Sequence, residues 1–471
     1  MASLQIFIFP LKMKNKLIIF LILFNLNSVL AQDTNKVLKY AEFISQVMTH
    51  HPSAYQAELI QDYGDAKLLS MKGYTDPKIF SDINQKYFSD KQYYSYFSGG
   101  IKVPTWYGIS VEAGYSLTDG DFINPENRLP ETGIVYAGIK VDLGNGLIWN
   151  ERRYALESGK IIQQSSEIER QIYLNELRYK ATEAYLKWYA NYQKYTIFLS
   201  AVENAEIRLK AVKASAEFGD RPIIDTTEAF ISLSNRILEM QTTFRDLQNS
   251  EAFLETYLWS NGEVPLELDG IVAEIPQEND IYIKENNLNE DPIAAHTFIQ
   301  IQEFKLSQSN IKLKLQKEQL KPDFSLKYNM LNEPIGTNPI AQYNVSNYQW
   351  GASFNYSILS RKQRGDVQLA KIQLEDQKLS LRIKQQEINY KINAAQNNYS
   401  TALLQAILTD KIVQSNLTLY RSEQSMFGIG ESSVFMMNTR ETNYIKAQKE
   451  NIDAKFSQFQ TLNELRYIMQ Y

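Results

Sequence analysis

Asp225 and Glu228 are the residues whose types and spacing most directly suggest chemistry. They lie three positions apart, so a helix would present both carboxylates on one face. Several such pairs at one constriction would attract cations, repel anions and raise some of the carboxyl pKa values. The alternative is structural, because a negative charge also stabilises the first turn of a helix, where Asp225 would lie.

The rest of the chain offers little for catalysis or metal binding. It contains no cysteine, which excludes disulfides, thiol catalysis and a lipidated N-terminal cysteine. Its only histidines are His50, His51 and His296, and two adjacent histidines near a helix start are more often surface residues than metal ligands. The sequence shows no Ser/His/Asp set, phosphate loop or zinc spacing. We therefore expect neither an enzyme nor a resident cofactor or metal.

The charge balance argues against a nucleic-acid partner. The 49 basic and 54 acidic residues give a net charge of −5, and they form no basic stripe. Thirty tyrosines are a large excess, which suits a wet, amphipathic interior or a membrane interface.

The first residues have the layout of a secretory signal peptide. Lys12, Lys14 and Lys16 precede the apolar stretch 17–24, and Val29 and Ala31 occupy positions −3 and −1 of a cleavage site. Cleavage after about Ala31 would export the mature chain from the cytoplasm.

Two long uninterrupted runs dominate the mature chain. Residues 151–218 and 361–427 contain no proline and one glycine each. They predict two helices roughly 100 Å long at about 1.5 Å per residue. Apolar residues recur at nearly heptad spacing, which indicates coiled-coil seams. These residues are Leu174, Leu177, Ala181, Ala184, Trp188, Tyr192, Tyr195 and Leu199, then Ile392, Ala395, Tyr399, Ala402, Ala406, Val413, Leu417 and Tyr420.

Each run ends at a glycine turn and is followed by a helical stretch that runs back, from Ile223 to about Ser260 and from Ser433 to about Met469. Gly219 and Gly430, which are 211 positions apart, can supply the left-handed conformation that a helix end favours. An internal repeat of about 210 residues accounts for this pattern.

Two alternating strands precede each long run. Residues 109–115 and 135–143 in the first half, and 322–330 and 349–358 in the second, alternate apolar with polar or small residues. This period fits membrane-spanning β-strands with one face toward lipid. The first half has about 30 additional residues around 93–106, which leave open a further hairpin or a long external loop.

Four strands cannot close a barrel, and an open sheet edge in lipid leaves backbone groups unpaired at several kcal/mol each. The chain must therefore oligomerise, and three chains give the smallest conducting closure. The expected fold is mainly α with β-barrel strands, in two tandem repeats. Each repeat has a helix, a strand pair and a long antiparallel coiled-coil helix hairpin. A trimeric twelve-stranded outer-membrane barrel would be continued by a periplasmic α-helical tunnel.

In this order of elements the chain resembles the TolC-type outer membrane factor family, also called outer membrane efflux proteins. The resemblance covers the whole mature chain. It rests on helices opened at Pro52 and Pro292, on strand-to-helix junctions at 141–146 and 356–361, and on the two glycine turns. It implies a homotrimer that forms the exit duct of a tripartite efflux pump or of a type I secretion system. Its partners would be outer-membrane lipid, a periplasmic membrane fusion adaptor and an inner-membrane transporter.

The resemblance also assigns roles to residues around the two turns. The adaptor-docking tips would be Phe218, Gly219, Asp220, Ile429, Gly430 and Glu431. The pore constriction would fall on Asp225, Glu228, Met436 and Thr439, so only the first repeat supplies carboxylates. Phe427 and Ser432 stand where some members hold a gate shut with Tyr and Arg, which implies a different or looser latch.

The predicted organisation has four parts. They are a signal peptide (1–31), a first repeat (32–262; barrel strands about 79–144, tip near 218–222), a linker (263–290) and a second repeat (291–471; strands about 322–358, tip near 427–432). The alternative is a secreted or periplasmic coiled-coil scaffold with a structural or adhesive role. That protein would explain the helices, but it would leave the apolar faces of four strands with nothing to bury them.

Overall fold

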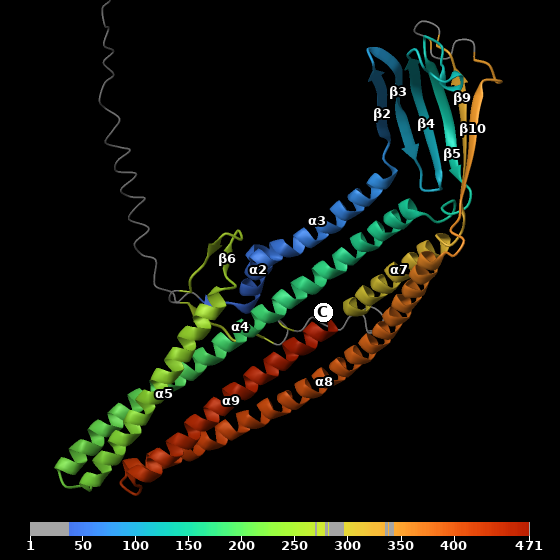
Figure 1. Cartoon of the computed structure of the whole chain (residues 1–471). Helices are drawn as coiled ribbons and strands as arrows, with labels where there is room; N and C mark the ends of the chain where they lie inside the picture. Colours follow the sequence, from blue (N-terminus) through green and yellow to red (C-terminus); the bar gives the residue numbers. More distant parts are fainter. Residues whose placement is uncertain are drawn as a thin grey trace, which may run out of the picture.

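The computed structural model describes residues 37–268, 271–277, 281, 296–334, 338 and 343–470. The molecule is elongated, with a curved sheet at one end and the turns of two helix hairpins at the other (Figure 1). The predicted signal peptide and the predicted helix start at Pro292 lie outside the described residues.

Long helices make up most of the described chain. They are α2 (Tyr40–His50), α3 (Pro52–Lys72), α4 (Glu151–Glu217), α5 (Ile223–Glu255), α7 (Thr297–Glu318), α8 (Arg361–Gly428) and α9 (Val434–Met469). The two predicted runs are confirmed as α4, of 67 residues, and α8, of 68. The Asn150 side chain begins α4 by accepting the Arg153 N–H at 2.9 Å, which satisfies one of the free donors at a helix start.

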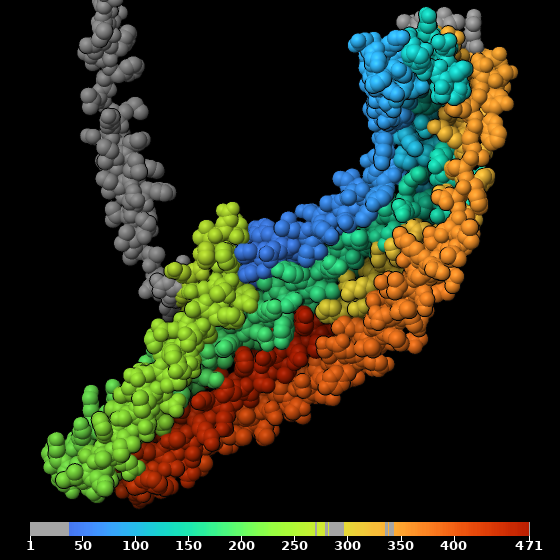
Figure 2. Space-filling model, viewed as in Figure 1, coloured from blue at the N-terminus to red at the C-terminus, as the bar shows by residue number. Residues whose placement is uncertain are grey.

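The helices are arranged along two long axes. α3 and α5 pack against different parts of α4, and α7 and α9 pack against different parts of α8 (Figure 1). α4 also contacts α7 and α9, so the two halves of the chain lie side by side (Figure 2). Among the described residues, no helix combines the length and the apolar character needed to cross a membrane.

The heptad seams are confirmed over most of their length. On α8 the buried residues Ile388, Ile392, Ala395, Ala402, Ala406 and Val413 follow one seam at spacings of three, four and seven. On α4 the prediction is wrong at Leu199, whose side chain is exposed, because the buried face passes instead through Phe198 and Ala201. A helix of 3.6 residues per turn drifts about 20° per heptad, so a fixed seven-residue pattern leaves the interface after several turns.

One antiparallel sheet of six strands forms the other end of the molecule. Its order is β10-β9-β5-β4-β3-β2. The strands are β2 (Lys78–Phe88), β3 (Lys91–Pro104), β4 (Ile109–Asp119), β5 (Ile134–Asp142), β9 (Asp323–Asn332) and β10 (Tyr348–Asn355). Four of these were predicted, and the additional residues of the first half form the β2–β3 hairpin. The sheet of the described chain therefore has six strands, and of the two alternatives left open for the additional residues, a further hairpin or a long external loop, the hairpin is the one present.

The two faces of the predicted strands differ sharply in chemistry. Val111, Ile139, Tyr328 and Trp350 pair in one row across β4, β5, β9 and β10, and all four are exposed. The next row along these strands is polar or small: it consists of Glu112, Gly138, Asn329 and Gln349. The alternation thus gives the sheet one apolar, exposed face and one polar face.

The main core lies near the middle of the molecule, where α2 and the segment after α5 cover α4. Its largest fully buried side chains include Phe43, Tyr185, Trp188 and Leu254. Short strands close this region: β1 (Val37–Leu38) pairs with β8 (Val272–Ala273), and β6 (Trp259–Ser260) pairs with β7 (Val264–Pro265). Two of these strands, β7 and β8, fall within the predicted linker.

Candidate functional site

The two hairpin turns have the same backbone structure. In the first, Gly219 donates to the carbonyl of Ala216, and Asp220 donates to that of Ser215. In the second, Gly430 donates to Phe427 and Glu431 donates to Met426, at the same spacings. Both glycines have a φ of +81°, which only glycine adopts freely. The internal repeat is therefore visible in individual hydrogen bonds.

The predicted tip residues project into solvent. Phe218 is 82% exposed and Ile429 is 72% exposed, although both are large apolar side chains. A Cβ atom added to Gly219 or Gly430 would meet nothing within 4 Å. The tips of the described chain are thus open surfaces with one exposed apolar side chain each, beside Asp220 or Glu431.

Arg221 connects the two tips within one chain. Its guanidinium lies 4.2 Å from the centre of the Phe427 ring, at the end of α8. The same group forms an ion pair with Asp225 at 3.6 Å, and both side chains are mostly buried. Phe427 also packs against a small apolar cluster formed by Leu209, Val212, Ala229 and Val434. Asp225 therefore faces a cation of its own chain.

The second turn uses different side chains at the matching positions. Ser432, the counterpart of Arg221, donates a short hydrogen bond to Glu423. Glu423 in turn forms an ion pair with Arg440 at 3.6 Å. Ser433 caps α9 by accepting the N–H of Met436 at 3.2 Å. Ser432 thus holds its turn against α8 and α9 within the second hairpin.

Two of the four predicted constriction residues line one groove. Glu228 on α5 and Thr439 on α9 both lie on it, together with Arg236, Asn438 and Thr442. Asp225 faces Arg221 instead, and Met436 is partly exposed beside the second turn. The groove thus brings Glu228 and Thr439 together, and its lining includes neither Asp225 nor Met436.

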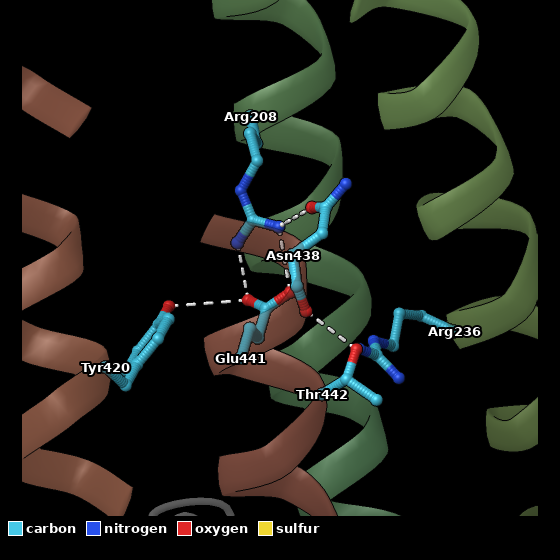
Figure 3. Close-up of polar contacts among 6 residues, drawn as sticks. All are labelled: Arg208, Arg236, Tyr420, Asn438, Glu441 and Thr442. Atoms are coloured by element: carbon cyan, nitrogen blue, oxygen red, sulfur yellow. Dashed lines mark hydrogen bonds and ion pairs between the residues drawn. The ribbon is translucent and has the colours of Figure 1, made fainter. Parts of the chain in front are cut away.

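A buried polar cluster above the tips joins four helices (Figure 3). Arg208 on α4 donates to both carboxylate oxygens of Glu441 on α9, at 2.5 and 2.8 Å. Tyr420 on α8 donates to the same carboxylate at 3.3 Å. Arg208 also reaches Asn438 at 2.8 Å, and Arg236 on α5 donates to Thr442 at 2.7 Å. Only 8% of Arg208 and 2% of Glu441 remains exposed.

The electrostatics of this cluster depend on the single carboxylate. Burial alone would lower the pKa of Arg208, but hydrogen bonding to Glu441 and its negative charge outweigh burial and raise it. Arg236 lacks a comparable partner, so burial lowers its pKa although Glu441 opposes this. Burial and the Glu441 charge together raise the pKa of the Tyr420 hydroxyl. Removal of the carboxylate would leave two buried guanidinium groups without compensation.

This cluster was not predicted from the sequence. Arg208 falls on the buried face of α4, among the small and apolar side chains of Ala201, Ala205 and Val212. Glu441 similarly falls on the buried face of α9. Charged residues at seam positions in both repeats are the signal that could have revealed a buried pair.

Two of the three histidines, His51 and His296, have structural roles as helix caps. The Nδ1 atom of His51 accepts the Ser53 N–H at 3.0 Å, and that of His296 accepts the Phe298 N–H at 3.3 Å. They cap α3 and α7, which are matching helices of the two halves. His296 is almost fully buried, and His51, one of the two adjacent histidines expected at the surface, is partly buried. Within the described residues, no group of three or more His, Cys, Asp or Glu side chains could hold a metal ion.

The sequence matches no model of a known protein family and no curated protein. Solved structures, in contrast, share its fold over nearly the whole chain. The Campylobacter jejuni CmeC outer membrane channel matches with a TM-score of 0.64 at 12% identity, over 91% of this chain and 85% of that one. The outer membrane protein VceC of Vibrio cholerae matches at 0.62 and 10%, over 91% and 95%.

The open state of the Neisseria gonorrhoeae MtrE outer membrane channel matches with a TM-score of 0.63 at 13% identity, over 91% of this chain and 88% of that one. At such low identity the likeness concerns the fold, and it extends from the sheet to the hairpin tips. The chain therefore has the fold that these outer-membrane channels share, which is the TolC-type fold that the sequence analysis expects.

Proposed function

We propose that the chain forms a trimeric outer-membrane channel-tunnel, the exit duct of a tripartite efflux pump or of a type I secretion system. The observation that carries this proposal is the contrast between the two faces of the sheet. An exposed row of Val111, Ile139, Tyr328 and Trp350 requires a lipid environment, and the opposite polar face suits a water-filled lumen. The helices extend away from the sheet (Figure 2), so in the trimer they would continue the wall of the pore away from the membrane.

The oligomer follows from the edges of the sheet. β2 and β10 are unpaired at their outer sides within the described chain. In lipid, each unpaired backbone group costs several kcal/mol, so the edges must meet other copies of the chain. The N-terminal signal sequence is consistent with export to the outer membrane, where the helices would occupy the periplasm.

The partners would dock at the other end. Phe218 and Ile429 are exposed apolar side chains beside glycines that leave the backbone accessible. Together with Asp220 and Glu431 they form a surface suited to a periplasmic adaptor, which an inner-membrane transporter would drive. Efflux and type I secretion both remain part of this proposal, and the adaptor bound by the tips would distinguish the two.

The gate and constriction would lie directly above these tips. Arg221 packs on Phe427 and pairs with Asp225, so it restrains the first hairpin against the second. Ser432 restrains the second turn through Glu423. Glu228 and Thr439 line the adjoining groove, with Asp225 and Met436 nearer the tips. In the trimer these residues would set the charge and width of the narrowest passage.

The deciding experiment is fractionation of cells that express the full chain. The outer-membrane fraction, extracted in detergent, is run on a gel with and without heating and after chemical crosslinking. We expect a heat-sensitive species of three chains. A soluble periplasmic species would contradict the proposal and favour the coiled-coil scaffold.

A further inference from the structure

The β2–β3 hairpin has no counterpart among the described residues of the second half, yet it is fully integrated into the sheet. β3 pairs with β4 over ten positions, from Ser95–Asp119 to Pro104–Ser110. β2 pairs with β3 over eleven positions, with one irregularity near Lys86. An external loop would have no reason to continue the hydrogen bonding of the sheet in this way.

The side chains of the hairpin continue both faces of the sheet. One row of directly paired residues crosses all six strands and is entirely apolar: it consists of Ile79, Ile101, Ala113, Ala137, Met330 and Tyr348. The row beside it also crosses all six and is polar or small: it consists of Lys78, Lys102, Glu112, Gly138, Asn329 and Gln349. Every residue of the apolar row is exposed. The hairpin therefore has the same lipid-facing side and the same lumen-facing side as the other four strands.

The dimensions of the hairpin also match a membrane wall. β2 has 11 residues and β3 has 14, and a transmembrane β-strand needs about 9–11. At its outer end, the rings of Phe88, Tyr93 and Phe122 pack against one another at centroid distances of 6.1 and 4.7 Å. Aromatic clusters at the ends of membrane-spanning strands are typical of the membrane–water interface.

We propose that the hairpin is part of the pore wall, so that three chains of six strands form an eighteen-stranded barrel in which β2 pairs with β10 of the neighbouring copy. This inference rests on the proposed trimer and specifies its interface. In a six-stranded antiparallel sheet the two edge strands run in opposite directions. A ring of such sheets placed head to tail is therefore antiparallel at every junction, as a closed barrel requires.

The circumference of such a barrel agrees with that of the helical tunnel. Four helical columns per chain give twelve per trimer, which need roughly 100–120 Å at about 8–10 Å per helix. Strands about 4.8 Å apart and tilted by about 40° each occupy roughly 6 Å of circumference. Eighteen strands then need about 110 Å, whereas twelve need about 75 Å. The wider barrel continues the tunnel without a large change of diameter.

Cysteine crosslinking in the otherwise cysteine-free chain tests the interface directly. Ile83→Cys on β2 is combined in turn with Trp350→Cys, Ala352→Cys or Phe354→Cys, which lie on the same face of β10. Ser353→Cys, on the opposite face, is the matched control. Since β2 and β10 are at opposite edges of one sheet, any link joins two copies. We expect at least one same-face pair to give dimer and trimer bands, and the control pair to give none.

Two results would overturn the inference while leaving the proposed function intact. The first is a trimer in which no β10 position links to Ile83→Cys. The second is a link between β10 and Val111→Cys on β4, because it would mean that the hairpin leaves the wall and β4 becomes the edge strand. If the unsubstituted chain forms no trimer, that result would instead contradict the proposed function.

Deletion of residues 78–104 provides a second test, because it removes the hairpin where its two ends lie side by side. A Ser353→Cys probe on the polar face is labelled from outside with polyethylene glycol maleimides of increasing mass. We expect the largest reagent that reacts to be smaller in the deletion variant than in the full chain. If the deletion variant assembles as a trimer and still reacts with the same largest reagent as the full chain, the proposal is overturned. If the deletion variant does not assemble, the cysteine crosslinks alone decide.

Discussion

Arg208 on α4 and Glu441 on α9 lie 233 positions apart in the sequence, yet they share two hydrogen bonds in a nearly dry site between the repeats. The pair connects the first helix hairpin to the second. Because Tyr420 also donates to Glu441, the same carboxylate reaches a third helix. The stability of the packed hairpins therefore depends strongly on one acidic side chain.

Substitution of one partner should be costly. Arg208→Ala leaves Glu441 buried without its cation, and we expect a loss of about 3–5 kcal/mol in unfolding free energy. Replacement of both, as Arg208→Met with Glu441→Leu, should recover part of this loss, because Arg236 would still lack the nearby carboxylate. Urea unfolding in detergent measures it. The control is Lys180→Ala, which breaks an exposed ion pair with Glu176 and should change the unfolding free energy very little. An equal loss of unfolding free energy in Arg208→Ala and Lys180→Ala would contradict the prediction.

The two faces of the sheet should respond oppositely to a new charge. Trp350→Lys places a cation on the apolar row and should destabilise the membrane-inserted form by about 2–4 kcal/mol. Gln349→Lys, one residue away on the polar row, should assemble normally. The measurement is the yield of heat-modifiable trimer in the outer-membrane fraction. Equal yields from the two variants would show that the rows do not separate lipid from lumen.

The glycine turns should tolerate asparagine, which accepts a positive φ, but the bulky side chain of leucine should impair their function. Gly430→Asn keeps a residue that accepts positive φ, so we expect a cost of about 1 kcal/mol or less and normal export. Gly430→Leu should lower export while the trimer yield stays the same, because the added side chain projects into open space where an adaptor would dock. Loss of the trimer would indicate a folding role for the turn instead. Gly219 provides the parallel pair of variants.

The two carboxylates near the tips should contribute unequally to ion selectivity. Asp225 is neutralised by Arg221, whereas Glu228 lines an open groove. We expect Glu228→Gln to weaken cation selectivity in planar bilayers more than Asp225→Asn does, and Asp225→Ala with Glu228→Ala to weaken it most. Arg221→Ala should increase cation selectivity, since it frees Asp225. Unchanged selectivity in the double variant would exclude a pore role for both residues.

The histidine caps predict a dependence of stability on pH. Burial lowers the pKa of His51 and His296 from their usual value near 6.5. As the pH falls, the unfolded chain therefore binds protons at a higher pH than the folded chain. The stability that the two caps contribute is complete above about pH 6.5 and is lost as the pH falls through the folded-state pKa values. His51→Asn with His296→Asn keeps side-chain caps that do not titrate, and should flatten the fall of the thermal midpoint below pH 6.5. The same fall in the double variant would assign it to other groups.

The sequence was sufficient for the helices and turns because their signals are local. The runs without proline, the seams and Gly219 and Gly430 each specify a structure within a few turns of helix. The β2 strand gave a weaker signal, because Ser81 and Gln85 interrupt its apolar face and Phe80 lies on its polar face. Its place in the sheet becomes evident only from its pairing with β3.

The residues that join the repeats could not be predicted in the same way. Arg208 and Glu441 belong to different halves, and nothing in either local sequence identifies the other as its partner. His51 and His296 were missed as caps because serine, threonine, aspartate and asparagine are the residues usually found at helix starts. Arg221 and Phe427 likewise meet only when the two hairpins lie side by side.

The hairpin inserted into only one of the two repeats has a consequence for symmetry. In the proposed trimer the two matching turns of each chain would present six nearly equivalent sites around the axis at the periplasmic end. At the membrane end, β2 and β3 occur once per chain, so the wall repeats only three times. A partner at the tips would therefore meet a surface close to sixfold, whereas anything that approaches from outside the cell would meet a strictly threefold one.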